Sequence, residues 1–145
     1  MSSYYISKAL KRQVIVAAKN RCGYCLVSQD LIPIQLTIEH IILRSAEGSS
    51  EEKNLWLSCS TCNNYKGSQV QATDPQSGKR VPLFNPRRQS WSQHFRWSED
   101  GLRMVGKTVT GRATVEALQL NHELALNARR FWMHVGKHPM IENND

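Results

Sequence analysis

The feature that most constrains this chain is a pair of matched Cys-x-x-Cys motifs. The cysteines are Cys22, Cys25, Cys59 and Cys62, the chain has no others, and 33 residues separate the two pairs. A tetrahedral zinc ion takes four ligands, with thiolate sulfurs at about 2.3 Å, and each Cys-x-x-Cys turn delivers two of them from one tight knuckle. Two knuckles fill the coordination shell. The motifs therefore predict a structural zinc site with no open position for a substrate.

Three other uses of the four cysteines fit the sequence less well. Disulfides need an oxidising compartment, and the residues after Met1 lead into a charged stretch instead of the apolar run of a secretion signal. Redox catalysis needs one Cys-x-x-Cys on a thioredoxin-like unit, whereas this chain has two matched pairs. An iron–sulfur cluster is the weaker metal alternative. We therefore expect a zinc site in a protein of the reducing cytoplasm.

Composition narrows the partners that the chain can have. Its 145 residues suffice for one compact domain with an extension. No apolar run approaches the roughly 18 residues of a membrane span, so no membrane partner is expected. The formal net charge of +7 favours a polyanion such as nucleic acid. Residues 1–30 carry +4, residues 31–78 carry −2 and residues 79–145 carry +5, so two basic flanks enclose a slightly acidic centre.

The residues between and after the cysteine pairs predict a short series of elements. Residues 35–38 alternate polar and apolar side chains and are rich in strand formers. Residues 44–53 are polar, contain Gly48 and predict a loop. Residues 54–58 predict a second strand that runs into the second cysteine pair, and a short helix is expected from Asn63 onward. The expected order is therefore strand, loop, strand, helix.

These residues resemble the HNH endonucleases that carry a four-cysteine zinc site, a group within the ββα-metal (His-Me finger) nucleases. The resemblance covers about residues 20–70, and a looser similarity to bacterial members continues at residues 82–87 and 111–115. It implies an α+β protein built on a ββα nuclease module that cleaves DNA with the help of a metal. The residues that carry it are Glu39-His40-Ile41-Ile42, Asn54-Leu55, Cys59-Ser60-Thr61-Cys62-Asn63 and Lys66-Gly67.

Phosphodiester hydrolysis explains why such residue types would occur together. A base must take a proton from the attacking water, and a cation must stabilise the charge that develops on the leaving oxygen. The resemblance implies that His40 is the general base, a role that suits a neutral imidazole near pH 7. It also implies that Glu39 and Asn63 bind the catalytic divalent ion, and their oxygen atoms favour Mg²⁺ or Mn²⁺. Asn54 would fix the loop and the tautomer of His40.

Some residues depart from the family pattern, and simpler roles exist for others. Glu39 stands where Asp is more common, and Leu43 stands where Pro is usual. The longer side chain of Glu39 would alter where the metal lies. Leu43 and residues 46–48, which replace a more glycine-rich turn, remove no catalytic group. The simpler alternatives are that Glu39 forms a surface salt bridge, that His40 merely ends a strand, and that Asn54 is a turn residue.

The basic flanks suggest where DNA would bind. Residues 7–20 predict a basic amphipathic helix with Ser7 as its N-cap. Residues 72–89 are rich in Pro, Gly and Asn and predict an irregular surface segment. The basic side chains expected to contact the DNA backbone are Lys66, Lys79, Arg80, Arg87 and Arg88. A solvated charge cluster without a nucleic-acid partner is the alternative for the last four.

The remainder of the chain predicts a hairpin followed by helices. The turn signal at residues 98–101 lies between Trp97 and Leu102, and helices are expected at residues 110–119 and 121–135. Trp91, Phe95 and Trp97 are expected in the core rather than as base-stacking residues. We expect residues 1–70 to form the nuclease module and residues 71–145 to form a basic extension packed on the same domain.

The function expected from the sequence is metal-dependent DNA cleavage by a bacterial or phage-encoded endonuclease, with structural Zn²⁺ and catalytic Mg²⁺ or Mn²⁺. The main alternative is a zinc-organised module that binds nucleic acid without cutting it, although a pure binder would not need a base beside a carboxylate. An RNA-directed nuclease is a third reading. The sequence leaves open whether the protein is a monomer or a homodimer.

Overall fold

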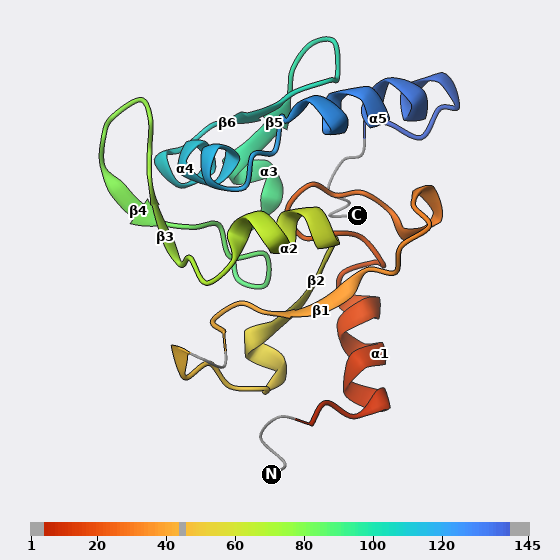
Figure 1. Ribbon diagram of the computed structural model, residues 1–145, viewed down its shortest axis with the longest axis vertical. Coiled ribbons are helices and arrows are strands. Elements are labelled where there is room, and N and C mark those ends of the chain that lie inside the picture. The colour runs from red at the N-terminus through yellow and green to blue at the C-terminus, as the bar shows by residue number, and fades with distance from the viewer. Residues whose placement is uncertain (1–4, 44–45, 140–145) are drawn as a thin grey trace. The chain divides into compact units, whose positions relative to one another are not determined.

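The computed structural model describes residues 5–43 and 46–139 (Figure 1). The chain divides into two compact units, one formed by Met1–Val70 with Asn85–Arg88 and the other by Gln71–Phe84 with Gln89–Asp145. Both contain helices and two-stranded antiparallel sheets, so the predicted α+β class is confirmed. None of the helices within the described residues is long and apolar enough to cross a membrane.

The first unit begins with helix α1, Lys8–Ala17. Its N-cap is Ser7, as predicted, because the Ser7 hydroxyl accepts a hydrogen bond from the backbone N–H of Leu10 at 3.1 Å. The helix packs against strand β2 and buries Val14. It ends earlier than residue 20 because Lys19 and Asn20 both adopt the left-handed conformation, each with φ of 55°.

The central part of this unit contains the expected series of two strands and a helix. Strand β1, Thr37–His40, pairs antiparallel with β2, Leu55–Ser58, so that Thr37 faces Ser58 and His40 faces Leu55. Helix α2, Ser60–Lys66, follows β2 directly. Two short 3₁₀ helices, η2 (Gln29–Leu31) and η4 (Glu52–Asn54), precede β1 and β2.

Two boundaries differ from the sequence prediction for local reasons. The first strand lies at Thr37–His40 instead of residues 35–38, because the Gln29 side chain accepts the backbone N–H of Leu36 at 2.7 Å and holds the preceding residues outside the ladder. The helix begins at Ser60 instead of Asn63, because the Cys59 thiol accepts the N–H of Cys62 and caps the helix.

The second unit contains the predicted hairpin and helices. Strands β5 (Phe95–Trp97) and β6 (Met104–Gly106) pair across the predicted turn. Helices α4 (Val109–Ala117) and α5 (Glu123–His134) follow close to their expected positions. Trp91 and Phe95 are buried and Trp97 is half-buried, with Trp91 packed against both other rings, so the core assignment is confirmed. Trp91 starts a further short helix, α3 (Trp91–His94), that was not predicted.

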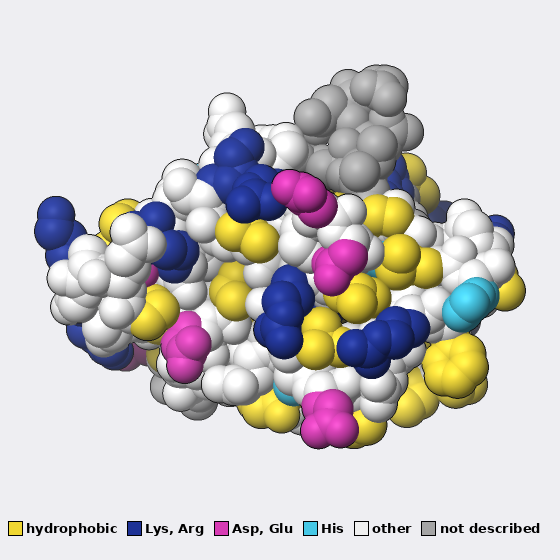
Figure 2. Space-filling model, turned by 90° about the horizontal axis from the view of Figure 1, so that it is seen from above, with side chains coloured by type: hydrophobic (Ala, Val, Ile, Leu, Met, Phe, Trp, Pro, Cys, Tyr) yellow, Lys and Arg dark blue, Asp and Glu magenta, His cyan; other side chains and the backbone are white. Residues whose placement is uncertain are grey.

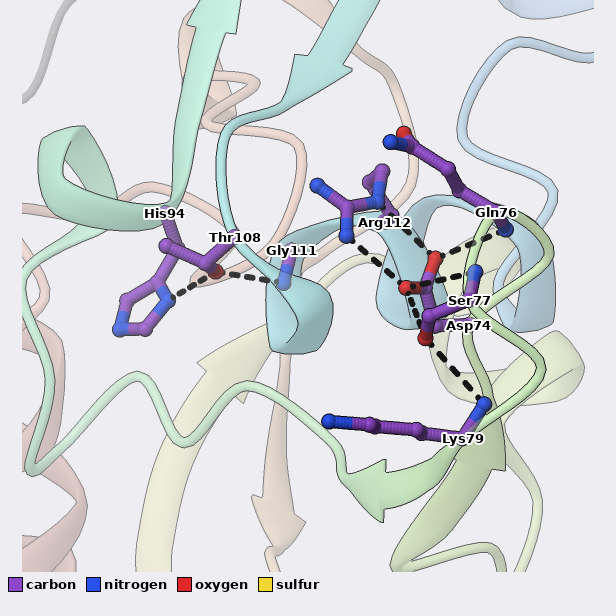
Figure 3. Close-up of polar contacts among 8 residues, drawn as sticks. All are labelled: Asp74, Gln76, Ser77, Lys79, His94, Thr108, Gly111 and Arg112. Carbon is purple, nitrogen blue, oxygen red and sulfur yellow. Dashed lines mark hydrogen bonds and ion pairs between the residues drawn. The ribbon is translucent and has the colours of Figure 1, made fainter.

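The prediction that residues 72–89 are irregular was wrong. Strand β3, Gln71–Thr73, pairs with β4, Arg80–Pro82, in a second hairpin. Its turn is organised by Asp74, whose side chain is fully buried and accepts hydrogen bonds from the backbone of Gln76 and Ser77 (Figure 3). Arg112 of α4 donates to both carboxylate oxygens, at 3.0 and 2.9 Å. The hairpin is therefore fixed to α4 by a bidentate ion pair.

The surface gives no sign of one continuous basic patch on the face drawn in Figure 2. Lys and Arg side chains lie there among apolar and acidic side chains.

Candidate functional site

The four cysteines come together at the junction of the first knuckle with helix α2. Their sulfur atoms all lie within 4.8 Å of one another, and the Sγ atoms of Cys25 and Cys59 are 3.8 Å apart. A tetrahedron with zinc–sulfur bonds of about 2.3 Å has sulfur–sulfur edges of about 3.8 Å. Cys22 and Cys62 are buried, while Cys25 and Cys59 are half-buried. The four cysteines are thus clustered for a zinc site, as predicted.

The first knuckle is held by backbone hydrogen bonds and one close contact. The Cys22 N–H donates to Val27 O and the Gly23 N–H donates to Leu57 O of β2, at 3.0 and 2.9 Å. A Cβ atom at Gly23 would lie 2.3 Å from Cδ1 of Trp56, so only glycine fits there. Burial raises the pKa of the Cys22 thiol well above its usual range. A bound cation would be needed to keep such thiols deprotonated.

Glu39 lies on the inner side of β1. Its side chain is only 3% exposed, and Oε2 accepts a hydrogen bond from the hydroxyl of Tyr24. Burial raises the pKa of the Glu39 carboxyl, and the nearby positive charge of Lys66 partly opposes this shift. The other oxygen, Oε1, is buried and has no hydrogen-bond partner among the described residues, although the buried hydroxyl of Ser58 lies near enough to lower the pKa of the carboxyl. The predicted alternative of a surface salt bridge does not fit this burial.

His40 is the next residue and the last one of β1, where successive side chains point to opposite sides. It is half-buried, and its Nε2 lies 3.0 Å from the hydroxyl oxygen of Ser50. The end of the strand therefore separates a buried carboxylate from a partly exposed imidazole. Ser50 was not singled out from the sequence, because it lies ten residues away in the polar loop.

Asn54 fixes both ends of the loop between the strands. Its Oδ1 accepts the N–H of Ile42 at 2.9 Å, and its Nδ2 donates to Ile42 O at 2.9 Å and to Ser49 O at 2.7 Å. The same loop brings Gly48 so close to Ile42 O that a Cβ atom would lie 1.7 Å away. These contacts agree with the predicted role of Asn54 in fixing the loop. Its predicted effect on the His40 tautomer remains a prediction.

Asn63 and Lys66 lie on helix α2. Asn63 directly follows Cys62 of the cysteine cluster and is half-buried in the middle of the helix. Lys66 is only 2% exposed, and its Nζ donates to Ile41 O at 2.8 Å. The lysine was predicted to contact DNA from the surface, whereas here it lies in the interior beside Glu39. We therefore leave it out of the proposed DNA-binding surface.

The four other basic residues predicted to bind DNA have different surroundings. Arg87 is held against β2, because its Nε donates to Leu55 O at 3.0 Å and its guanidinium lies 4.8 Å from the centre of the Trp56 ring. Lys79, Arg80 and Arg88 are exposed. Three of the four are thus available to a phosphate backbone, and Arg87 is chiefly occupied within the first unit.

The main residue that sequence reasoning missed is Tyr24. It lies between Cys22 and Cys25 and is fully buried. A signal was present, since an aromatic residue inside a tight knuckle has little freedom to point outward. Its partner Glu39 could not be identified from spacing, because the hydrogen bond spans 15 residues.

Comparisons with known proteins agree with this geometry. Residues 22–69 match the family model for HNH endonucleases. The chain is 27% identical over 114 residues to the Septu protein PtuB of Bacillus thuringiensis, an alignment that covers 77% of this chain and 41% of that protein. The chain therefore spans about two fifths of the length of this relative. No solved structure matches the chain at a significant level.

Proposed function

We propose that this protein, whose residues 22–69 match the family model for HNH endonucleases, is a metal-dependent endonuclease that hydrolyses phosphodiester bonds of DNA. The observation that carries the proposal is the arrangement at the end of β1. There a partly exposed imidazole, His40, directly follows a buried carboxylate, Glu39, that has one oxygen without a hydrogen-bond partner among the described residues. A module that only binds nucleic acid has no need of this pair.

His40 is proposed to act as the general base. A base must lie within hydrogen-bond distance of the water that it deprotonates. The hydroxyl of Ser50 already lies at that distance from Nε2, so an O–H group can occupy this position beside the ring. Asn54 supports the base indirectly, because it fixes the loop that carries Ser49 and Ser50 to the end of β1.

Glu39 and Asn63 are proposed to hold the catalytic divalent ion, Mg²⁺ or Mn²⁺. The buried Oε1 of Glu39 and the half-buried amide of Asn63 are oxygen donors of the kind that these ions prefer. When bound, such a cation supplies positive charge that stabilises the leaving oxygen. Both residues are linked to the cysteine cluster, because Asn63 directly follows Cys62 and Glu39 accepts a hydrogen bond from Tyr24 of the first knuckle.

The four-cysteine cluster is proposed to hold a structural Zn²⁺ that does not take part in the reaction. The four sulfurs would by themselves complete the tetrahedral shell of the ion. DNA would be attracted by the net positive charge and held through exposed side chains such as Lys79, Arg80 and Arg88. The bacterial source of the aligned relative supports a bacterial or phage-encoded origin.

The test is incubation of supercoiled plasmid with the full chain, with and without Mg²⁺ or Mn²⁺. The wild-type protein should nick or linearise the plasmid only when a divalent ion is added. His40→Ala should bind DNA with unchanged affinity and cut it at least ~10²-fold more slowly, while His134→Ala, an exposed histidine on α5, should behave as wild type.

Two results would contradict the proposal. If the wild-type protein binds DNA but never cuts it, the protein is a zinc-organised binding module. If His40→Ala cuts at the wild-type rate, the general base lies elsewhere in the chain.

A further inference from the structure

The proposed chemistry makes no use of Tyr24, although this residue is completely buried beside the site. Tyr24 is 0% exposed and lies between the cysteines of the first knuckle. Its hydroxyl donates a hydrogen bond to Oε2 of Glu39, which lies 15 residues further along the chain. The tyrosine therefore joins the cluster of cysteines to the carboxylate on β1.

The two oxygens of Glu39 have different surroundings. Oε2 is occupied by the Tyr24 hydroxyl, whereas Oε1 is buried with no hydrogen-bond partner among the described residues, and the buried Ser58 hydroxyl that lies near the carboxylate also has none. A buried carboxylate oxygen without a partner is costly, because it has lost its contact with water. Lys66 lies near enough to influence Glu39, but its ammonium donates to the backbone oxygen of Ile41. Oε1 is thus the atom of Glu39 to which a cation could bind.

We propose that Tyr24 is a positioning residue for the divalent-cation site: by holding Oε2 of Glu39, it leaves Oε1 as the single oxygen through which Glu39 binds the cation. This inference rests on the proposed function. Partners that orient a metal-binding carboxylate from outside the coordination shell usually affect metal affinity strongly. Because Tyr24 is flanked by Cys22 and Cys25, the knuckle determines where the carboxylate lies.

The experiment uses Tyr24→Phe, which removes the hydroxyl and keeps the ring in the core. The matched control is Tyr5→Phe, since Tyr5 is 70% exposed. For each protein, zinc content is measured by elemental analysis, and Mn²⁺ affinity is measured without DNA by electron paramagnetic resonance of the free ion. Tyr24→Phe should keep its zinc and weaken Mn²⁺ binding by about 10–100-fold. Tyr5→Phe should change neither quantity.

A second pair of variants tests whether the effect passes through Glu39. Glu39→Ala should weaken Mn²⁺ binding, and adding Tyr24→Phe to Glu39→Ala should weaken it no further. Unchanged Mn²⁺ affinity in Tyr24→Phe would overturn the inference while leaving the proposed function intact. Loss of zinc from Tyr24→Phe would also overturn it, because the hydroxyl would then support the knuckle instead of the carboxylate. A wild-type protein that neither binds Mn²⁺ nor cuts DNA would instead refute the proposed function itself.

Discussion

The side-chain amide of Asn54 forms a reciprocal pair of hydrogen bonds with the backbone of Ile42, 2.9 Å long in each direction. These two hydrogen bonds resemble those between paired strands, and they lie just beyond the ends of β1 and β2. Both the N–H and the carbonyl of Ile42 depend on it. The loop that starts there is consequently closed by one side chain.

Asn54→Asp should open this loop. The substituted carboxylate has nearly the same shape as the amide, but it cannot donate to the carbonyl oxygens of Ile42 and Ser49. Leaving buried acceptors without donors should lower the free energy of unfolding by at least about 2 kcal/mol. Urea denaturation measures this change. Asn64→Asp, at an exposed position on α2, is the control and should have little effect.

Loss of one zinc ligand should unfold the first unit. Zinc binding contributes about 10–16 kcal/mol in finger peptides, whereas a whole domain is stable by about 5–15 kcal/mol. Cys22→Ser and Cys59→Ser should therefore lose helical circular dichroism, and the wild-type protein should contain about one zinc ion per chain. Thr61→Ser, at an exposed position between two ligands, should keep its zinc. A wild-type protein with paired disulfides and no metal would contradict this prediction.

Two neighbouring arginines should respond differently to substitution. Arg88 is exposed, so Arg88→Gln should reduce the slope of log affinity for DNA against log salt by about 0.9 and leave thermal stability unchanged. Arg87 donates to Leu55 O and stacks on Trp56, so Arg87→Gln should lower the free energy of unfolding by about 1–2 kcal/mol. Salt titrations of DNA binding and thermal melts of both variants check the contrast. Identical behaviour of the two variants would show that Arg87 is not held by β2.

The ion pair between Asp74 and Arg112 should make stability depend on pH. Hydrogen bonds from Arg112 hold the pKa of the Asp74 carboxyl well below its usual range. A carboxyl with a depressed pKa in the folded state stabilises the fold above its unfolded pKa of about 3.9 and loses that contribution as pH falls toward the folded value. Asp74→Asn should therefore melt at a lower temperature than wild type at pH 7, and the difference should shrink below about pH 4.

Melting curves recorded from neutral to acidic pH test this prediction. Glu99→Gln also removes one carboxylate, but at an exposed position. Its difference in melting temperature from wild type should not shrink as the pH falls. A constant difference between Asp74→Asn and wild type at every pH would mean that the carboxylate charge contributes nothing to stability.

The series of elements around the cysteines could be predicted from the sequence because its signals are local. The cysteine spacing, the short strands and the capped helix each depend on residues that lie close together along the chain. The β3–β4 hairpin could not be predicted in this way, because its turn depends on the ion pair between Asp74 and Arg112, which lies 38 residues further along the chain. In the same way, the burial of Glu39 reverses the usual preference of a carboxylate for solvent. It requires Tyr24 and Lys66, which come from two other elements.

The thiol of Cys59 both belongs to the cysteine cluster and caps helix α2. A helix of seven residues is too short to persist in water on its own. Before the cluster closes, α2 should therefore be largely unformed, and Asn63 and Lys66 should have no fixed place. Metal uptake would then act as the nucleation step for the helix, and the time course of helix formation after rapid mixing with zinc should follow the time course of thiolate–metal absorption.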